Sequence, residues 1–180
     1  MWQTINSYAS TEQAIQNPFS FYFVMDKDWS STHNYDYWNI NFTSGVGVNN
    51  VTILKTVYDP SISGFTLPKT AAFTGFTSTG SSSQNANQFN VNGSFDRGWN
   101  FYTNGWKTGG LVYFYGLGNR EVYGVNYGKI VYVEKEGFYW SCGTQSDSGG
   151  GSLDLGANFV TTLSRGNCRS SGFNCRPVKE

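Results

Sequence analysis

The sequence predicts an α+β fold, with two short helices early in the chain and several short antiparallel strands late. Aromatic residues make up 18% of the chain and glycines number 22, whereas charged residues make up only 13%, against about 25% in typical domains. This composition is typical of short strands joined by tight turns and is unlike that of a disordered chain. Helix signals end near residue 75, and strand signals lie close together after residue 110.

The first helix is predicted at residues 10–16. Ser10 is a favourable N-cap, Gln13 stands at the capping-box position, and Pro18 ends the helix. The aromatic run at residues 19–25 then predicts a buried strand.

The next segment, residues 26–50, is polar and rich in turn residues, and it predicts a long loop that carries two tryptophans and the only histidine. Apolar and polar residues alternate at 51–58 and predict a strand. A second short helix is predicted at 68–73, where Gly75 is placed to terminate it.

Residues 77–88 are rich in Ser, Thr, Asn and Gly, which favours a surface loop rather than a linker between domains. Gly-rich or polar turns separate the strand signals that follow. The predicted strands are 111–115, 129–134, 138–142, 158–163 and 173–178. We find no internal repeat.

Length and charge set limits on the organisation and the partners. A chain of 180 residues suits one domain spanning 1–180, either alone or as the C-terminal part of a longer chain. Twelve basic residues balance twelve acidic ones without a block of like charge, so nucleic-acid binding is not expected. No apolar run approaches the roughly 18 residues of a membrane span.

The N-terminus, Met1-Trp2-Gln3-Thr4, lacks the basic and apolar regions of a signal peptide. Three settings are consistent with this: a cytoplasmic protein, a fragment of a longer secreted chain, or a phage structural protein that is assembled in the cytoplasm and used outside it.

Five motifs in a fixed order carry a family resemblance. The motifs are KTVYDP (55–60), GFTLP (64–68), GLGNR (116–120), GFYWS (137–141) and RSSGFNCRPV (169–178). With the upstream IQNPFSFY (15–22), the chain resembles the C-type-lectin-fold domains of Bacteroidales surface and phage proteins, called fimbrillin-like or major paralogous domains. The resemblance covers residues 11–180 and implies a C-type lectin fold with a ligand-binding role.

The motifs also make physical sense as scaffold. Tyr139 and Trp140 would form a bulky core anchor within a strand. Arg120, Arg169 and Arg176 would satisfy buried carbonyls or carboxylates, because a guanidinium offers five donors in a rigid fork.

Some members of this family are variable proteins of diversity-generating retroelements, in which a reverse transcriptase randomises adenines of a template. The segments 144–151 and 161–168 are small, polar and irregular, as such diversification would leave them, whereas Gln145 and residues 134–136 lie outside the attainable set. A lectin-fold adhesin without a retroelement is the alternative. The nucleotide sequence would decide between them.

The predicted binding face lies in the C-terminal half, displayed between the scaffold strands. Its members combine an attainable residue type with a position between apolar frame residues. They are Tyr123, Asn126, Tyr127, Tyr132, Phe138, Asp147, Asp154, Asn158, Phe159, Thr161, Arg165 and Asn167. The alternative binding region is the aromatic loop around Trp29, Tyr35, Tyr37 and Trp38.

Two catalytic alternatives, a serine protease and a formylglycine-generating-type oxidase, have partial support in the sequence. Asp147-Ser148-Gly149-Gly150 resembles the sequence around the nucleophile of chymotrypsin-type proteases, with His33 upstream as that order requires. However, Ser146 stands where that family has glycine, and Gly151 stands where it has proline. The fold would also be shared with formylglycine-generating oxidases, but Cys168 and Cys175 lack that family's surroundings, and a fold does not fix a function.

No cofactor or metal is expected. The EPN or QPD triplet of calcium-dependent lectins is absent, and the three cysteines, Cys142, Cys168 and Cys175, form no CxxC pair. Their spacing is compatible with one disulfide or with three thiols. We therefore expect a non-enzymatic domain of a phage tail fibre or bacterial surface adhesin that binds a protein or glycan receptor. The alternative function is a structural fibre or pilus subunit.

Overall fold

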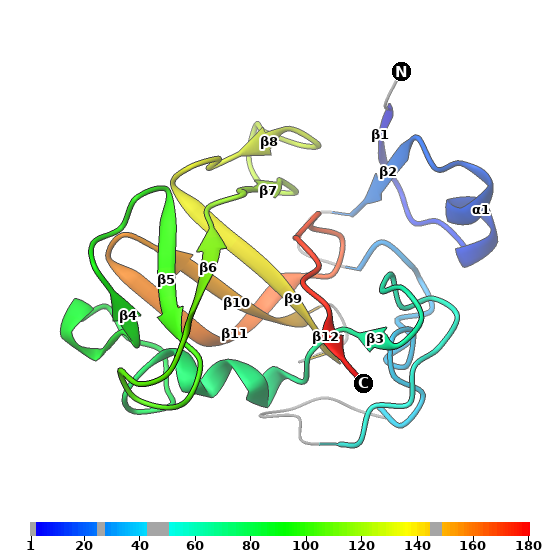
Figure 1. Cartoon of the computed structure of the whole chain (residues 1–180). Coiled ribbons are helices and arrows are strands. Elements are labelled where there is room, and N and C mark those ends of the chain that lie inside the picture. Colours follow the sequence, from blue (N-terminus) through cyan, green and yellow to red (C-terminus); the bar gives the residue numbers. More distant parts are fainter. Residues whose placement is uncertain (1–2, 25–27, 43–50, 145–148) are drawn as a thin grey trace.

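The computed structural model describes residues 3–24, 28–42, 51–144 and 149–180 (Figure 1). Within these residues the chain forms twelve short strands, one α-helix and two 3-10 helices. The fold is strand-rich and mostly antiparallel, as predicted. No helix among the described residues has the length and apolar character needed to cross a bilayer.

Two three-stranded antiparallel sheets form the C-terminal part. The central sheet has the order β11-β10-β9, and the second has the order β4-β5-β6. Their strands are β9 (Glu136–Thr144), β10 (Gly149–Gly156), β11 (Phe159–Cys168), β4 (Val91–Asn92), β5 (Gly98–Tyr102) and β6 (Leu111–Tyr115). Strand β6 coincides with its predicted range, 111–115.

The N-terminal elements lie on the other side of the molecule (Figure 1). Strand β1 (Gln3–Asn6) pairs in parallel with β2 (Ser20–Phe23), and helix α1 (Thr11–Gln16) connects them. The predicted capping box is confirmed, because Ser10 Oγ accepts from the Gln13 amide while the Gln13 side chain accepts from the Ser10 amide.

The predicted strand at 51–58 is wrong. Only Lys55 makes a strand-type bridge, to Asn39, and Val57 is 91% exposed. The Lys55 ammonium instead donates to the carbonyls of Ser61, Ile62 and Phe65, which turns the chain back on itself. Among the described residues the alternating pattern has no neighbouring strand with which to form a ladder, and without one it does not become a strand.

The second predicted helix is displaced. The structure has a 3-10 helix, η1 (Thr70–Phe76), where the sequence predicted a helix at 68–73. Gly75 lies inside this helix and does not terminate it. Residues 77–88 form the expected loop apart from a single 3-10 turn, η2 (Ala86–Gln88).

Two predicted strands are much shorter than expected. At 129–134 only β8 (Ile130–Val131) forms, pairing with β7 (Asn119–Arg120), because Tyr132 and Glu134 adopt φ of 61° and 65°, which is incompatible with an extended strand.

At 173–178 the ladder is limited to Val178. Val178 is the first residue of β12 (Val178–Lys179), which pairs with β3 (Phe65–Thr66). The rest of the predicted strand contributes only an isolated bridge from Asn174 to Tyr139.

Strand β10 was not predicted at all. Its glycines have low strand propensity, yet it pairs with β9 on one side and β11 on the other, and its eight residues are all buried. A Cβ at Gly150 would lie 2.4 Å from Trp140 Cζ3. Glycine is therefore required here by close packing, although the sequence at 144–151 predicted an irregular segment.

The predicted core anchor is confirmed. Tyr139 and Trp140 are 3% and 5% exposed and belong to different clusters, because successive residues of a strand face opposite sides. Tyr139 packs in the main core with Phe114, and its hydroxyl donates to the Tyr115 carbonyl at 2.6 Å. Trp140 stacks on Phe173 with ring centroids 4.3 Å apart.

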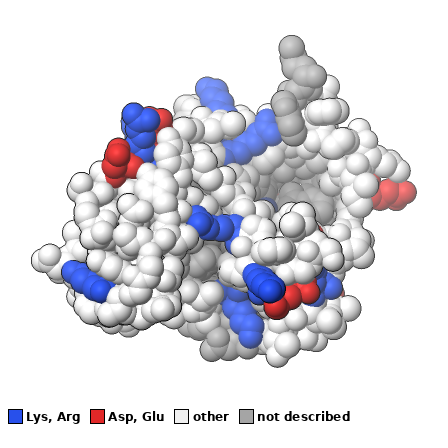
Figure 2. Space-filling model, in the orientation of Figure 1, with Lys and Arg blue, Asp and Glu red and all other residues white. Residues whose placement is uncertain are grey.

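The predicted role of the three arginines, the bonding of buried carbonyls or carboxylates, is confirmed for Arg169 alone, because the carbonyls bonded by Arg120 and Arg176 belong to residues that are not buried. Arg120 donates to the Gly128 carbonyl, and Arg176 donates to the Tyr113 carbonyl. Arg169 donates to the Asn34 carbonyl and to the Asp28 carboxylate. Elsewhere on the face in view, charged side chains are few and dispersed (Figure 2).

Candidate functional site

The structure divides the predicted C-terminal binding face. Tyr123, Asn126 and Tyr127 lie between β7 and β8, and Tyr132 follows β8. The three tyrosines are 37–45% exposed. This group contacts the N-terminal side of the molecule, because Tyr127 stacks on Phe23 with ring centroids 5.0 Å apart.

A second group of the predicted residues lies in the central sheet, where the side chains are buried or already in contact with neighbouring residues. Asp154 is 8% exposed and accepts from Ser152 and Asn167 at 2.8 and 2.9 Å. Phe138 packs against Phe173 with ring centroids 4.9 Å apart. These side chains serve the scaffold because their polar groups or ring faces are already in contact with other residues.

The remaining members lie elsewhere again. Asn158 lies in the β10–β11 turn and Phe159 opens β11, beside Val160, which bridges Ser83 in the 77–88 loop. Thr161 follows in β11 and is half-buried. Asp147 and the side chain of Arg165 lie outside the described residues. The predicted residues therefore do not form one surface.

A pocket of 280 Å³ lies between the aromatic loop and the end of the central sheet. Trp29, Tyr35, Tyr37 and Trp38 all line it, so the alternative binding region is the one that the fold organises. The other lining residues come from α1, the 51–64 segment, β9, β10 and the chain after β11. They are Thr11, Ala14, Ile15, Asn34, Tyr58, Trp140, Cys142, Gly143, Thr144, Gly150 and Arg169.

The aromatic rings of the pocket contact one another in both stacked and edge geometries. Trp29 and Tyr37 are stacked with centroids 5.5 Å apart, and Tyr58 meets Tyr37 edge-on at 5.6 Å. Trp38 lies 6.3 Å from Trp140. Offset stacking and edge contacts are favourable arrangements for aromatic pairs. The walls of the pocket are therefore fixed by mutual packing.

Hydrogen bonds hold the loop in this position. The Tyr37 hydroxyl and Thr11 Oγ1 are 2.9 Å apart, and the Thr56 hydroxyl donates to the Tyr37 carbonyl. Asn39, which is fully buried, accepts from the amides of Asn41 and Leu54 through its side-chain oxygen. The loop needs these side-chain bonds because it has few main-chain partners.

A buried ion pair ties the loop to the C-terminal part. Arg169 contacts Asp28, and their side chains are 10% and 0% exposed. The Arg169 guanidinium also lies 5.7 Å from the centre of the Tyr35 ring. Burial raises the pKa of Asp28 above its usual value, although Arg169, backbone hydrogen bonds and His33 act in the opposite direction.

The pocket offers little for acid–base or nucleophilic chemistry within the described residues. Burial, with a smaller contribution from Asp59, raises the pKa of the Cys142 thiol to about 11, so the thiol stays neutral near pH 7 and is a poor nucleophile. His33 lies near Asp28, at 3.6 Å from Nδ1 to Oδ2, but the described pocket wall does not include it. The protease reading also needs residues 147 and 148, which lie outside the described residues.

Metal binding finds no support in the described part of the chain, where no group of three His, Cys, Asp or Glu side chains gathers. Cys142, Cys168 and Cys175 are all free thiols. Of the two alternatives that the cysteine spacing allowed, the structure has the three thiols.

Several residues of the site were not among the predicted binding residues. Trp140 and Gly150 come from strands, and Tyr58 comes from a segment predicted as a strand. The four aromatic residues of the loop lie close together in the sequence and could be recognised there, but no local pattern connects residue 29 with residue 140.

Comparisons with family models, curated proteins and solved structures found no match for this chain.

Proposed function

We propose that this chain is a receptor-binding domain of a phage tail fibre or bacterial surface adhesin, and that it binds its ligand in the aromatic pocket. The observation that carries the proposal is a wall of six aromatic side chains that the fold gathers from distant parts of the chain. Pockets lined mainly by apolar and aromatic groups, with few polar ones, are typical of ligand sites.

The proposed binding requires no chemistry. Tyr and Trp give large contact areas at low entropy cost, which makes them effective binding anchors. The pocket wall is already ordered by ring packing and by the Asp28–Arg169 pair. A pre-formed site loses less entropy when its ligand binds.

The C-type lectin fold remains part of the proposal. It is supported by the motif order in the sequence and by the small antiparallel sheets and long loops of the chain. Retroelement diversification receives less support at 149–151, because a Cβ at Gly151 would lie 2.8 Å from both Ser141 Oγ and Thr70 Oγ1. A reverse-transcriptase gene beside a near-repeat of the region from about 116 to 178 would establish diversification.

A structural role in a fibre or pilus is the second candidate. It is favoured by the exposed apolar residues around β8, where Val125 and Ile130 are 86% and 72% exposed. Apolar surface of this kind commonly marks contacts between proteins. Sedimentation would detect it as self-association that Ile130→Asp abolishes.

A fragment screen tests the binding proposal without assuming a ligand class. Neutral, cationic and anionic single-ring fragments would be screened by ligand-observed NMR against the wild type, Trp29→Ala and Trp106→Ala. Trp106 is 42% exposed in the β5–β6 turn and serves as the matched control. We expect hits that Trp29→Ala loses and Trp106→Ala keeps; hits unaffected by Trp29→Ala would place binding elsewhere.

A further inference from the structure

We propose that the pocket receives one amphipathic aromatic side chain, a tryptophan or a tyrosine, from a protein ligand. This inference rests on the proposed function and names the class of partner. It follows from four properties of the pocket: the geometry of its rings, the state of its polar groups, its charge and its size.

The rings present both faces and edges to the space between them. Trp29 and Tyr37 are inclined by 28°, whereas Tyr37 and Tyr58 are inclined by 85°. An aromatic ring has a negative face and a positive edge, so a ring that enters such a pocket finds offset-stacked and edge-to-face partners together. An aliphatic chain gains only burial from the same walls.

Some polar groups of the wall are already bonded to other residues of the wall. The Tyr37 hydroxyl pairs with Thr11, and the Asn34 carbonyl accepts from Arg169. A sugar needs several hydrogen-bonding groups around its hydroxyls, and these two bonds leave the Tyr37 hydroxyl and the Asn34 carbonyl less able to supply them. The balance therefore favours a ligand group that is mainly apolar.

The Thr144 hydroxyl differs from these bonded groups. Thr144 is 8% exposed, and its hydroxyl is buried without a hydrogen-bond partner among the described residues. A buried hydroxyl without a partner is unfavourable. An indole N–H or a phenol O–H is a suitable partner, because each places one polar group at the end of an apolar ring. This observation favours tryptophan and tyrosine over phenylalanine and leucine.

The charge of the wall disfavours ionic ligand groups. Arg169 is the only charged residue among the described residues of the pocket wall, and its guanidinium contacts Asp28 and the Asn34 carbonyl. Among the described residues that line the pocket there is no carboxylate, a group that would favour a cation. The positive charge of Arg169 further disfavours a cation over the rings.

The volume limits the ligand to a small group. At 280 Å³ the pocket lies just below the range of about 300–1,000 Å³ that is typical of sites for whole small molecules. One large side chain suits this space, whereas an extended oligosaccharide does not. Single aromatic anchors buried in pockets dominate many protein interfaces.

The test uses side-chain analogues as probes. N-acetyl amides of tryptophan, tyrosine, phenylalanine, leucine and lysine, together with methyl glycosides of glucose, galactose and N-acetylglucosamine, would be titrated by protein-observed NMR. We expect the tryptophan and tyrosine amides to bind with Kd on the order of 1 mM, as small fragments do. Trp29→Ala should weaken them at least about tenfold, and Trp106→Ala should leave them unchanged.

Thr144→Val provides the specific control, because it keeps the shape of the side chain and removes the hydroxyl. It should abolish the preference for tryptophan and tyrosine over phenylalanine without weakening phenylalanine. Binding of glycosides in place of the amides would overturn the inference in favour of a glycan, and so would an equal preference for all amides in the wild type. If no probe of either kind bound while ring fragments still occupied the pocket, this inference would fail and the proposed function would stand.

Discussion

The C-terminal part of the chain, from η1 onward, and the segment between β2 and η1 differ in how their main-chain groups are hydrogen-bonded. From η1 onward, ladders of strand pairs dominate, and both β10 and β5 are hydrogen-bonded on both sides. Between β2 and η1, the described chain has only the two-residue strand β3 and an isolated bridge. There the bonds come from side chains such as Asn39, Lys55 and Asp59.

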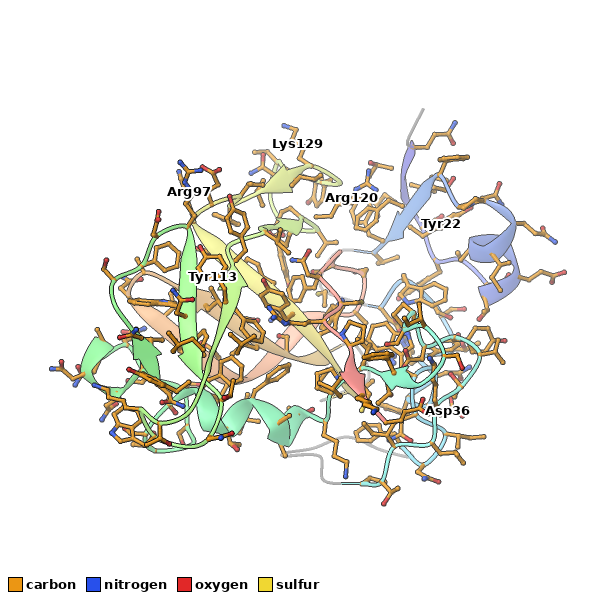
Figure 3. All side chains as sticks on the ribbon, in the orientation of Figure 1. Tyr22, Asp36, Arg97, Tyr113, Arg120 and Lys129 are labelled. Atoms are coloured by element: carbon orange, nitrogen blue, oxygen red, sulfur yellow. The ribbon has the colours of Figure 1, made fainter. Side chains whose placement is uncertain are left out.

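This difference separates the framework from the site. A ladder distributes its bonds over many residues, whereas a loop held by side chains depends on a few. Asp59, for example, accepts from the amides of Ser61 and Leu67 and from the hydroxyl of Thr66. Because the loop supplies most aromatic walls of the pocket, changes in its few bonding residues should alter binding more than global stability. Figure 3 shows Asp36 of this loop far across the molecule from Arg97 beside β5.

The largest effect is expected from Trp140→Ala, because Trp140 lies where the two parts meet. Its ring packs on Phe173 and faces Trp38, and it is 5% exposed. Removing a large buried aromatic side chain should lower the free energy of unfolding by about 3–5 kcal/mol. Urea denaturation measures this, with Trp106→Ala as the exposed control. Equal midpoints for the two variants would show that Trp140 is not an anchor.

The buried ion pair tests whether the loop depends on single contacts. Arg169→Met should destabilise the protein by about 3 kcal/mol, because it leaves the buried Asp28 carboxylate without its counter-ion. Arg97→Met is the matched control, since Arg97 pairs with Glu134 at 3.3 Å on the surface and should give no measurable change. Similar midpoints for both variants would contradict the contrast between the two regions.

The pH dependence of the same pair has a defined sign. The folded pKa of Asp28 lies above its ordinary value of 3.8, so the folded state binds the proton more tightly than the unfolded state does. As pH rises from 3.8 through the folded pKa, the wild type should lose stability relative to Asp28→Asn and then level off. Urea midpoints from pH 3.5 upward measure this, and a gain for the wild type would mean that Arg169 outweighs burial.

Close packing in the ladder is tested by Gly150→Ala. The added methyl group would overlap the Trp140 ring, so a cost of about 1–3 kcal/mol is expected. Gly75→Ala is the control, because a Cβ at Gly75 meets nothing within 4 Å. Thermal unfolding compares the two variants. If Gly150→Ala left stability unchanged, the packing argument against diversification at this position would no longer hold.

The smallest change in stability is expected from Lys55→Met, which removes three hydrogen bonds to carbonyls in the loop. Partial exposure lets water replace some of them, so the cost should be about 1–2 kcal/mol. Fragment binding should nevertheless fall, because Tyr58 follows closely in the same segment. Hydrogen exchange would locate the loosening; protection lost in β9–β11 instead would argue against a separable loop.

The sequence by itself determined the features that depend on neighbours along the chain. The capping box at Ser10 and Gln13 and the strand at 111–115 follow from local patterns, and both are present. The core anchor at Tyr139–Trp140 and the bonding of Arg169 were also predictable, because large aromatic and guanidinium groups have few other ways to be buried.

Only the tertiary structure decided the rest. Residues 51–58 carry a strand pattern but have no strand beside them, whereas β10 has a poor pattern but two neighbours. The pocket likewise depends on bringing Trp29 and Trp140, more than a hundred residues apart in the chain, into one wall. A ladder or a pocket wall is a property of two segments together, so its formation depends on the partner that the fold supplies and not on either segment alone.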